Sequence, residues 1–268
     1  MTNQAIIISD CGYEFQNAVL WGENEGVIRL QYTGATTIPV GTVITLRATS
    51  NFPSLSGPGF ASNNVSVLNP YPANWLIQSM NGTNSFNLNS GGDQLFFFQP
   101  NVGAAFTNPV GTHNATFTNC TLLYAFNTKT TWTSHAGLAT GNTQDSALPP
   151  GSLCFSMNPT AATDFVKFTD LVAGGTFLTR TQRFWIIDID NSANWSTLGT
   201  CAAYNAALPN YAAGYVFPIT AATFQNGLWT GAKTQDWFDC RNWDDAEVRT
   251  AASNVVINQT RILDCQVG

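Results

Sequence analysis

Two carboxylates near the end of an apolar run are candidates for cation binding. Asp188 and Asp190 flank Ile189 in the segment RFWIIDID, and Asn191 follows them. In a strand, the period of two residues would put both carboxylates on one face, about 7 Å apart. Oxygen ligands of this kind suit Ca²⁺, although the glycine and the terminal glutamate of an EF-hand loop are missing. The sequence therefore indicates either a calcium site at Asp188, Asp190 and Asn191 or a solvated strand end.

Catalytic patterns are sparse in the rest of the chain. The two histidines, His113 and His135, lie in polar, loop-like sequence, and neither a G-x-S-x-G elbow nor an H-E-x-x-H motif is present. A hydrolytic triad needs a base beside its nucleophile. A pair of acids could also cleave glycosides, but two acids alone are common in proteins. We therefore predict that the chain is not an enzyme.

Six widely spaced cysteines suggest structural cross-links. None forms a C-x-x-C pair or lies near a histidine, so the pattern indicates neither zinc binding nor redox chemistry. An even number fits three disulfides, although other pairings are open and buried free thiols are the alternative. The spacing favours Cys240 with Cys265, Cys11 with Cys120, and Cys154 with Cys201.

The eight tryptophans raise the question of sugar stacking. An aromatic face near a loop can bind a carbohydrate, whereas one inside an apolar run belongs to a core. Trp75, Trp132 and Trp195 are close to loops and are the candidates for carbohydrate binding, with packing as the alternative.

The elements that must position these residues are predicted to be strands. Short apolar segments rich in Val, Ile, Phe and Thr alternate with turn residues, and no sustained helical period is visible. Apolar runs at residues 95–98 and 184–187 indicate strands buried on both faces. The alanine-rich stretch 201–214 is interrupted by Pro209, so we expect at best a short helix there. Strands are expected at residues 5–9, 27–32, 42–48, 74–78, 94–98, 122–127, 183–188 and 253–257.

The predicted fold is therefore all-β: a β-sandwich domain with long loops over residues 1–225, and a second, smaller tryptophan-rich β module over residues 226–268. The boundary is placed where the alanine-rich connection gives way to a segment of different character.

Composition excludes several kinds of partner. Charged residues make up 10% of the chain and the net charge is −6, against roughly 25% charged residues in an ordinary domain. No basic stripe is available for nucleic acid. No apolar run approaches the ~20 residues that cross a bilayer. A neutral surface of Asn, Thr, Ser and Gln suits a β-protein outside the cell.

The segment WTGAKTQDWFDCRNW (residues 229–243), with SNVVINQ after it, resembles a module of large secreted proteins from Bacteroidetes-type bacteria. Trp-Thr-Gly, Asp-Trp and Asn-Trp match that module in order and spacing. The Pro-containing turn that usually follows is absent from residues 244–250, and we expect the module to be incomplete in this chain. The resemblance implies that Trp229, Trp237 and Trp243 pack a small core.

Residues 5 to about 200 resemble the lamin-tail-like β-sandwich domains of bacterial surface proteins. The likeness rests on IPVGTVITL, FNLNSGGDQLFFFQ, LLYAFN and SALPPG, whereas the loop NFPSLSGPGF and the cysteines depart from it. In such bacteria Asp-Ser/Thr-small apolar sequences accept O-glycans, which makes Ser146 in Asp145-Ser146-Ala147 a candidate attachment site.

We therefore expect an extracellular or cell-surface structural or adhesive protein without a resident cofactor, calcium excepted. Self-association into a filament or surface layer, or attachment to a cell-surface glycan, would be its mode of action. The alternative is a carbohydrate-binding module of a secreted multidomain protein.

Overall fold

The architecture is that of a computed structural model. It describes residues 4–14, 20–22, 25–48, 65–81, 86, 92–107, 114–129, 131–132, 146–149, 156–157, 165–169, 172–173, 176–177, 179–211, 215–220, 227–230, 235, 237, 239, 242–243 and 254–257.

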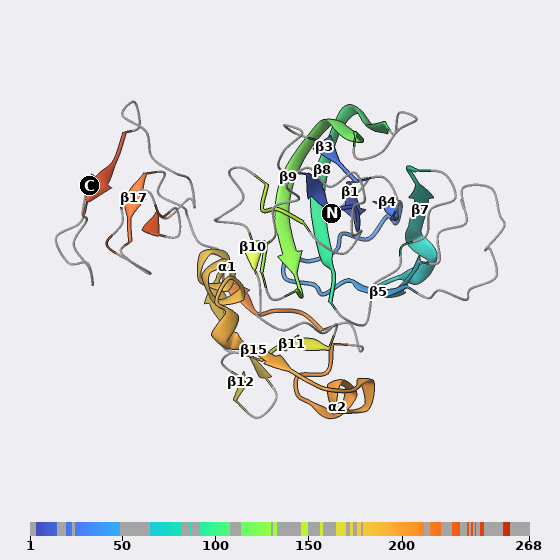
Figure 1. The fold of residues 1–268 in the computed structure, drawn as a ribbon. Coiled ribbons are helices and arrows are strands. Elements are labelled where there is room, and N and C mark those ends of the chain that lie inside the picture. The colour runs from blue at the N-terminus through green and yellow to red at the C-terminus, as the bar shows by residue number, and fades with distance from the viewer. Residues whose placement is uncertain are drawn as a thin grey trace.

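A six-stranded sheet forms the centre of the protein (Figure 1). Its order is β10 (Ser156–Met157), β9 (Thr116–Asn127), β8 (Gln94–Thr107), β1 (Ala5–Ser9), β4 (Val27–Tyr32) and β7 (Trp75–Ser79). The strands from β9 to β7 pair antiparallel, and the short β10 joins β9 in parallel. The prediction of an all-β protein is confirmed.

The central strands bury both of their faces. Ile7 of β1 packs in one core cluster and its neighbour Ile8 packs in another on the opposite face. In β8, Phe96 and Phe98 join the first cluster, while Phe97 packs against the second. The continuous apolar run at residues 95–98 therefore belongs to a strand covered on both sides, as predicted.

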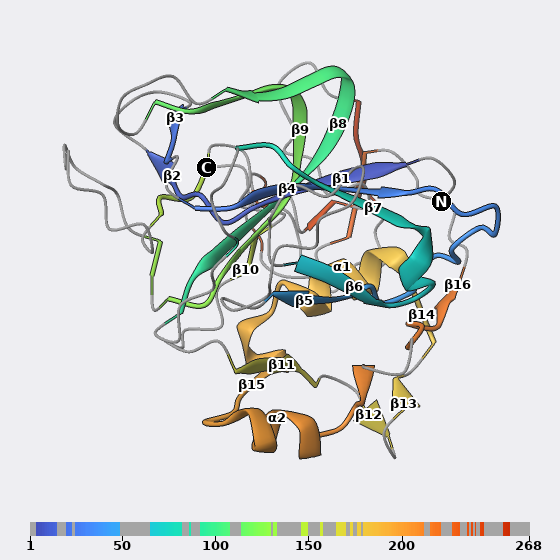
Figure 2. The ribbon, with the colours of Figure 1, turned by 90° about the vertical axis from the view of Figure 1, so that its right-hand side faces the viewer.

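Each face of the sheet has its own cover (Figure 2). The hairpin of β5 (Thr45–Ala48) and β6 (Val65–Asn69) supplies Val65 and Val67 to the second cluster. On the other face, β2 (Tyr13–Glu14) and β3 (Leu20–Trp21) place Trp21 in the first cluster.

The outer halves of β8 and β9 bend over the sheet toward β3 (Figure 2). The register shifts between Pro100 and Ala105, and Asn119 on the partner strand adopts a left-handed backbone with φ 52°. Because such an irregularity increases local bending, the hairpin can turn this corner. Beyond it, Phe117 packs against Trp21, as Phe98 also does, and Phe106 packs against Phe117.

A second set of elements, within residues 165–220, packs around Phe168, Phe177 and Trp185. Its helices are α1 (Gln182–Ile189) and α2 (Cys201–Ala206). The remaining elements are η2 (Pro72–Asn74), before β7, and β11 (Val166–Phe168), β12 (Val172–Ala173), β13 (Thr176–Phe177), β14 (Arg180–Thr181), η4 (Ser192–Asn194), β15 (Trp195–Thr197) and β16 (Ile219–Thr220).

The strand predicted at residues 183–188 is wrong, because this segment is helix α1. Thr181 caps the helix, its side chain accepting a hydrogen bond from the Phe184 amide at 3.3 Å. Trp185 is buried while Phe184 is 55% exposed, so the run is not covered on both faces. The stretch 201–214 contains the short helix α2, as expected.

Three tryptophans make a small core near the C-terminal end of the described chain. Trp229 on β17 (Leu228–Trp229) and Trp243 are fully buried, and their rings lie 5.1 Å apart. Trp237 packs against Trp243 at 4.6 Å. Strand β18 (Val256–Ile257) pairs in parallel with β17. Among the described residues, no helix is long and apolar enough to cross a membrane.

Candidate metal centre

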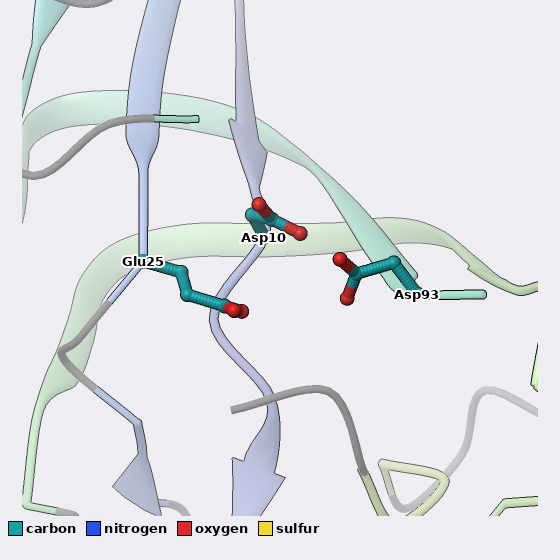
Figure 3. Close-up of side chains that lie close together, drawn as sticks. All are labelled: Asp10, Glu25 and Asp93. Carbon is teal, nitrogen blue, oxygen red and sulfur yellow. The ribbon is translucent and has the colours of Figure 1, made fainter. Parts of the chain in front are cut away.

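Three carboxylates meet at one end of the main sheet. Asp10 directly follows β1, Glu25 lies two residues before β4, and Asp93 directly precedes β8. Because β1 is antiparallel to both neighbours, its end lies beside their beginnings. The three side chains consequently converge (Figure 3).

The spacing of these carboxylates suits one bound cation. One oxygen from each of Asp10, Glu25 and Asp93 lies within 4.8 Å of the others. Ca²⁺ binds its oxygen ligands at about 2.4 Å, so two oxygens that share one Ca²⁺ ion lie no more than about 4.8 Å apart. Asp10 is 0% and Asp93 3% exposed, and Glu25 is half-buried. The buried acidic triad could therefore bind a metal ion.

Main-chain hydrogen bonds hold two of the carboxylates in position. The Asp10 amide donates to the Gly26 carbonyl at 3.0 Å, which ties it to the start of β4. The Asp93 amide donates to the Thr128 hydroxyl at 2.8 Å, and Asp93 Oδ1 accepts from the Gln94 amide at 2.9 Å. Gln94 in turn donates its side-chain amide to the Asp10 carbonyl at 2.9 Å. A site on such fixed segments needs little rearrangement to bind an ion.

The nearby thiol of Cys11 does not add a sulfur ligand. It donates to the Glu25 carbonyl at 3.3 Å and is 1% exposed. Burial raises the pKa of this thiol strongly, and the charges of Asp10 and Glu25 raise it further. The ligand atoms that converge are the carboxylate oxygens of Asp10, Glu25 and Asp93, and oxygen donors favour a hard cation such as Ca²⁺ or Mg²⁺.

Sequence reasoning missed this site because its members are distant along the chain. A signal was present: each acid stands at the boundary of an apolar strand, in ISDC, ENEGVI and GGDQLFFF. To use that signal, one must know that β1 pairs with both β4 and β8, and the sequence does not reveal this pairing.

The residues proposed for calcium from the sequence have protein partners instead. Asp188 forms an ion pair with Arg180, and Asp190 accepts a hydrogen bond from the Tyr124 hydroxyl at 2.6 Å. Asn191 accepts from the Ala193 amide at 3.2 Å. The strand geometry that motivated this prediction is absent, because Asp188 belongs to helix α1.

The cysteine pairings are corrected by the structure where it describes them. Cys11, Cys120 and Cys201 are free thiols, so the pairs Cys11 with Cys120 and Cys154 with Cys201 do not form. The Cys120 thiol donates to the Thr118 carbonyl at 3.2 Å, and Cys201 is exposed on α2. Cys154, Cys240 and Cys265 lie outside the described residues, as do His113 and His135.

Ser146 is not placed for glycan attachment. It is 1% exposed, accepts from the Tyr13 amide at 2.8 Å and donates to the Ala147 carbonyl at 2.9 Å. The hydroxyl is thus part of the packing between β2 and residues 146–149.

The three tryptophans suggested for sugar binding do not form one platform. Trp75 is buried against Tyr32, while Trp132 packs on Phe96 in the other cluster. Trp195 lies between the two parts of the fold, and its indole N–H donates to the Ile189 carbonyl at 2.9 Å. Comparison with family models, characterised proteins and solved structures finds no match for the chain.

Proposed function

We propose that this chain is a structural or adhesive protein of the cell surface or extracellular space, and that Ca²⁺ bound by Asp10, Glu25 and Asp93 stabilises its main sheet. The observation that carries the proposal is the convergence of three carboxylates from three adjacent segments of the sheet. An ion there would join the end of β1 to the beginnings of β4 and β8.

Calcium connects this site to the extracellular setting. Extracellular modules bind Ca²⁺ with dissociation constants of roughly 10⁻⁴ to 10⁻³ M. Sites of this affinity are occupied at the calcium concentration outside cells and empty at that of the cytosol. A stabilising ion of this affinity suits a protein whose chain has few charged residues, 10% in all. The likeness of residues 229–243 to modules of secreted proteins points the same way.

Self-association is the second part of the proposal. In the described sheet, β7 has β4 on one side and no other named strand beyond it. Its sequence, WLIQS, contains none of the charges or prolines that commonly block edge pairing. Sedimentation velocity over a wide concentration range tests this part, and a monomer at every concentration would count against it.

Thermal unfolding in Ca²⁺ and in EDTA tests the cation site. Wild-type protein should gain about 2.7 kcal/mol when calcium is present at 100 times its dissociation constant. For a protein of this size, that corresponds to a rise in Tm of roughly 5 to 11 °C. Asp10→Asn should abolish the rise, because the substitution removes a charged ligand.

Asp188→Asn is the matched control. It neutralises a carboxylate that pairs with Arg180 and lies outside the triad, so the calcium response should persist. A response lost in Asp188→Asn and retained in Asp10→Asn would overturn the assignment, as would a wild-type Tm that calcium does not change.

A further inference from the structure

The turn between β6 and β7 holds an exposed aromatic side chain in an unusual conformation. In the sequence Asn69-Pro70-Tyr71-Pro72-Ala73-Asn74, Tyr71 has φ 51° and ψ 60°, the left-handed region. A bulky side chain rarely adopts this backbone, which glycine or asparagine would accept more easily. Tyr71 is nonetheless 45% exposed, so burial of its ring does not account for the choice of residue.

Surrounding contacts fix the turn rigidly. The Trp75 indole N–H donates to the Pro70 carbonyl at 2.8 Å, and the Asn74 amide donates to the Tyr71 carbonyl at 2.9 Å. Thr33 ties the turn to the end of β4, because both its amide and its hydroxyl donate to the Asn74 carbonyl. A recognition loop held this way loses little entropy on binding.

Other aromatic rings lie beneath Tyr71. Its ring lies 6.3 Å from that of Tyr32, which lies 5.1 Å from Trp75. Tyr32 and Trp75 are 0% and 6% exposed. The buried rings therefore support Tyr71 from the protein side and leave part of it open to solvent.

The polar groups around the turn are uncharged. Residues 31–40 and 65–79 contain no Asp, Glu, Lys or Arg. Thr33 is exposed, and Asn74, three residues after Tyr71, is half-buried. A Cβ built on Gly34 would lie 2.3 Å from the Tyr32 hydroxyl and 2.7 Å from the Asn74 side-chain nitrogen, so amide and hydroxyl groups crowd together here. The Tyr32 hydroxyl is buried and has no hydrogen-bond partner among the described residues.

We propose that this turn binds a neutral saccharide. The Tyr71 ring offers a flat apolar face to the C–H face of a sugar, and Thr33 and Asn74 offer hydrogen-bonding groups to its hydroxyls. A neutral sugar fits better than an acidic one because residues 31–40 and 65–79 contain no Lys or Arg. The site lies at the opposite end of β4 from the acidic triad, since Tyr32 pairs with Trp75 while Val27 pairs with Ser9. It is thus separate from the proposed calcium site.

A glycan array carrying neutral and acidic saccharides tests the proposal, with the full chain as probe. Wild-type protein should bind neutral glycans, and Tyr71→Gly should weaken that binding by about tenfold or more. Because glycine adopts the left-handed region without strain, which offsets part of the packing lost on Tyr32, Tyr71→Gly should stay folded with a Tm close to that of wild type. Phe184→Ala removes the other exposed aromatic ring of the described chain and should leave binding unchanged.

Three results would overturn the site. They are the absence of neutral-glycan binding by wild-type protein, equal binding by Tyr71→Gly, and a Tm of Tyr71→Gly well below that of wild type. The last result would assign Tyr71 a structural role. None of these results bears on the calcium response, so the two proposals can fail separately.

Discussion

At the scale of single residues, the three described cysteines differ sharply in their surroundings. Cys11 is buried and its pKa is strongly raised by desolvation, Cys120 is half-buried with a raised pKa, and Cys201 is exposed. Because alkylation requires an accessible thiolate, iodoacetamide should label Cys201 first and Cys11 only after unfolding. Mass spectrometry of labelled peptides measures this order. Equal protection of Cys11 and Cys120, lost together on reduction, would instead indicate a disulfide between them.

The candidate site also shows which residue-level inferences the sequence permits. An acid next to an apolar run is visible in the chain, and Asp188 and Asp10 look alike by that criterion. What separates them is the neighbour that the fold supplies: an arginine for Asp188, and two further acids for Asp10. Only the pairing of distant strands decides this, and one sequence does not reveal such pairing.

At the scale of elements, several strands could be predicted because their signals are local. The bounds expected for β1 and β4 agree with the structure, since β1 contains the apolar run Ile6–Ile8 and β4 alternates apolar and polar residues from Ile28 to Tyr32. Strand β8 was expected to end at residue 98 but continues to Thr107, because a register shift accommodates Pro100. The sequence predicts a strand where helix α1 lies, because the apolar run is too short to reveal a helical period.

The tryptophan module gives a prediction at the same scale. Trp243→Ala should cost about 3 to 5 kcal/mol, because Trp243 is 0% exposed and touches both Trp229 and Trp237. A two-stranded sheet is marginal without a core, so amides of β17 and β18 should lose protection from hydrogen exchange while β1 and β4 keep theirs. Val256→Ala, at a site 44% exposed, is the control and should change little. Loss of protection throughout the main sheet would contradict a separate core.

At the scale of the whole molecule, the main sheet must be joined to the elements of residues 165–220. The main sheet and the elements around Phe168 meet where Tyr124 of β9 donates to Asp190 after α1, and where the rings of Phe126 and Trp195 lie 5.2 Å apart. The backbone of residues 41–43 also bonds with residues 215–217. The sequence offers no local signal for this contact, because none of these residues is unusual for its own element.

The Tyr124 contact makes stability sensitive to alkaline pH. Burial raises the pKa of Tyr124 strongly, and the charge of Asp190 and the hydrogen bond to it raise the pKa further. An unfolded tyrosine ionises near pH 10. Below that pH the phenol is protonated in both states. Above it the unfolded state loses its proton first, so the free energy of unfolding falls as pH rises.

Tyr124→Phe should therefore act in two ways. Near neutral pH it should cost about 1 to 3 kcal/mol, because Asp190 loses a hydrogen-bond donor in a partly buried setting. Above pH 10 the variant should lose stability less steeply than wild type, because one buried phenol is gone, while Tyr211, whose pKa burial also raises, still titrates. Urea unfolding between pH 7 and pH 11 measures both effects. Parallel pH profiles for the two proteins would show that Tyr124 ionises equally in the folded and unfolded states. An unchanged stability at pH 7 would show that other contacts join the main sheet to the elements around Phe168.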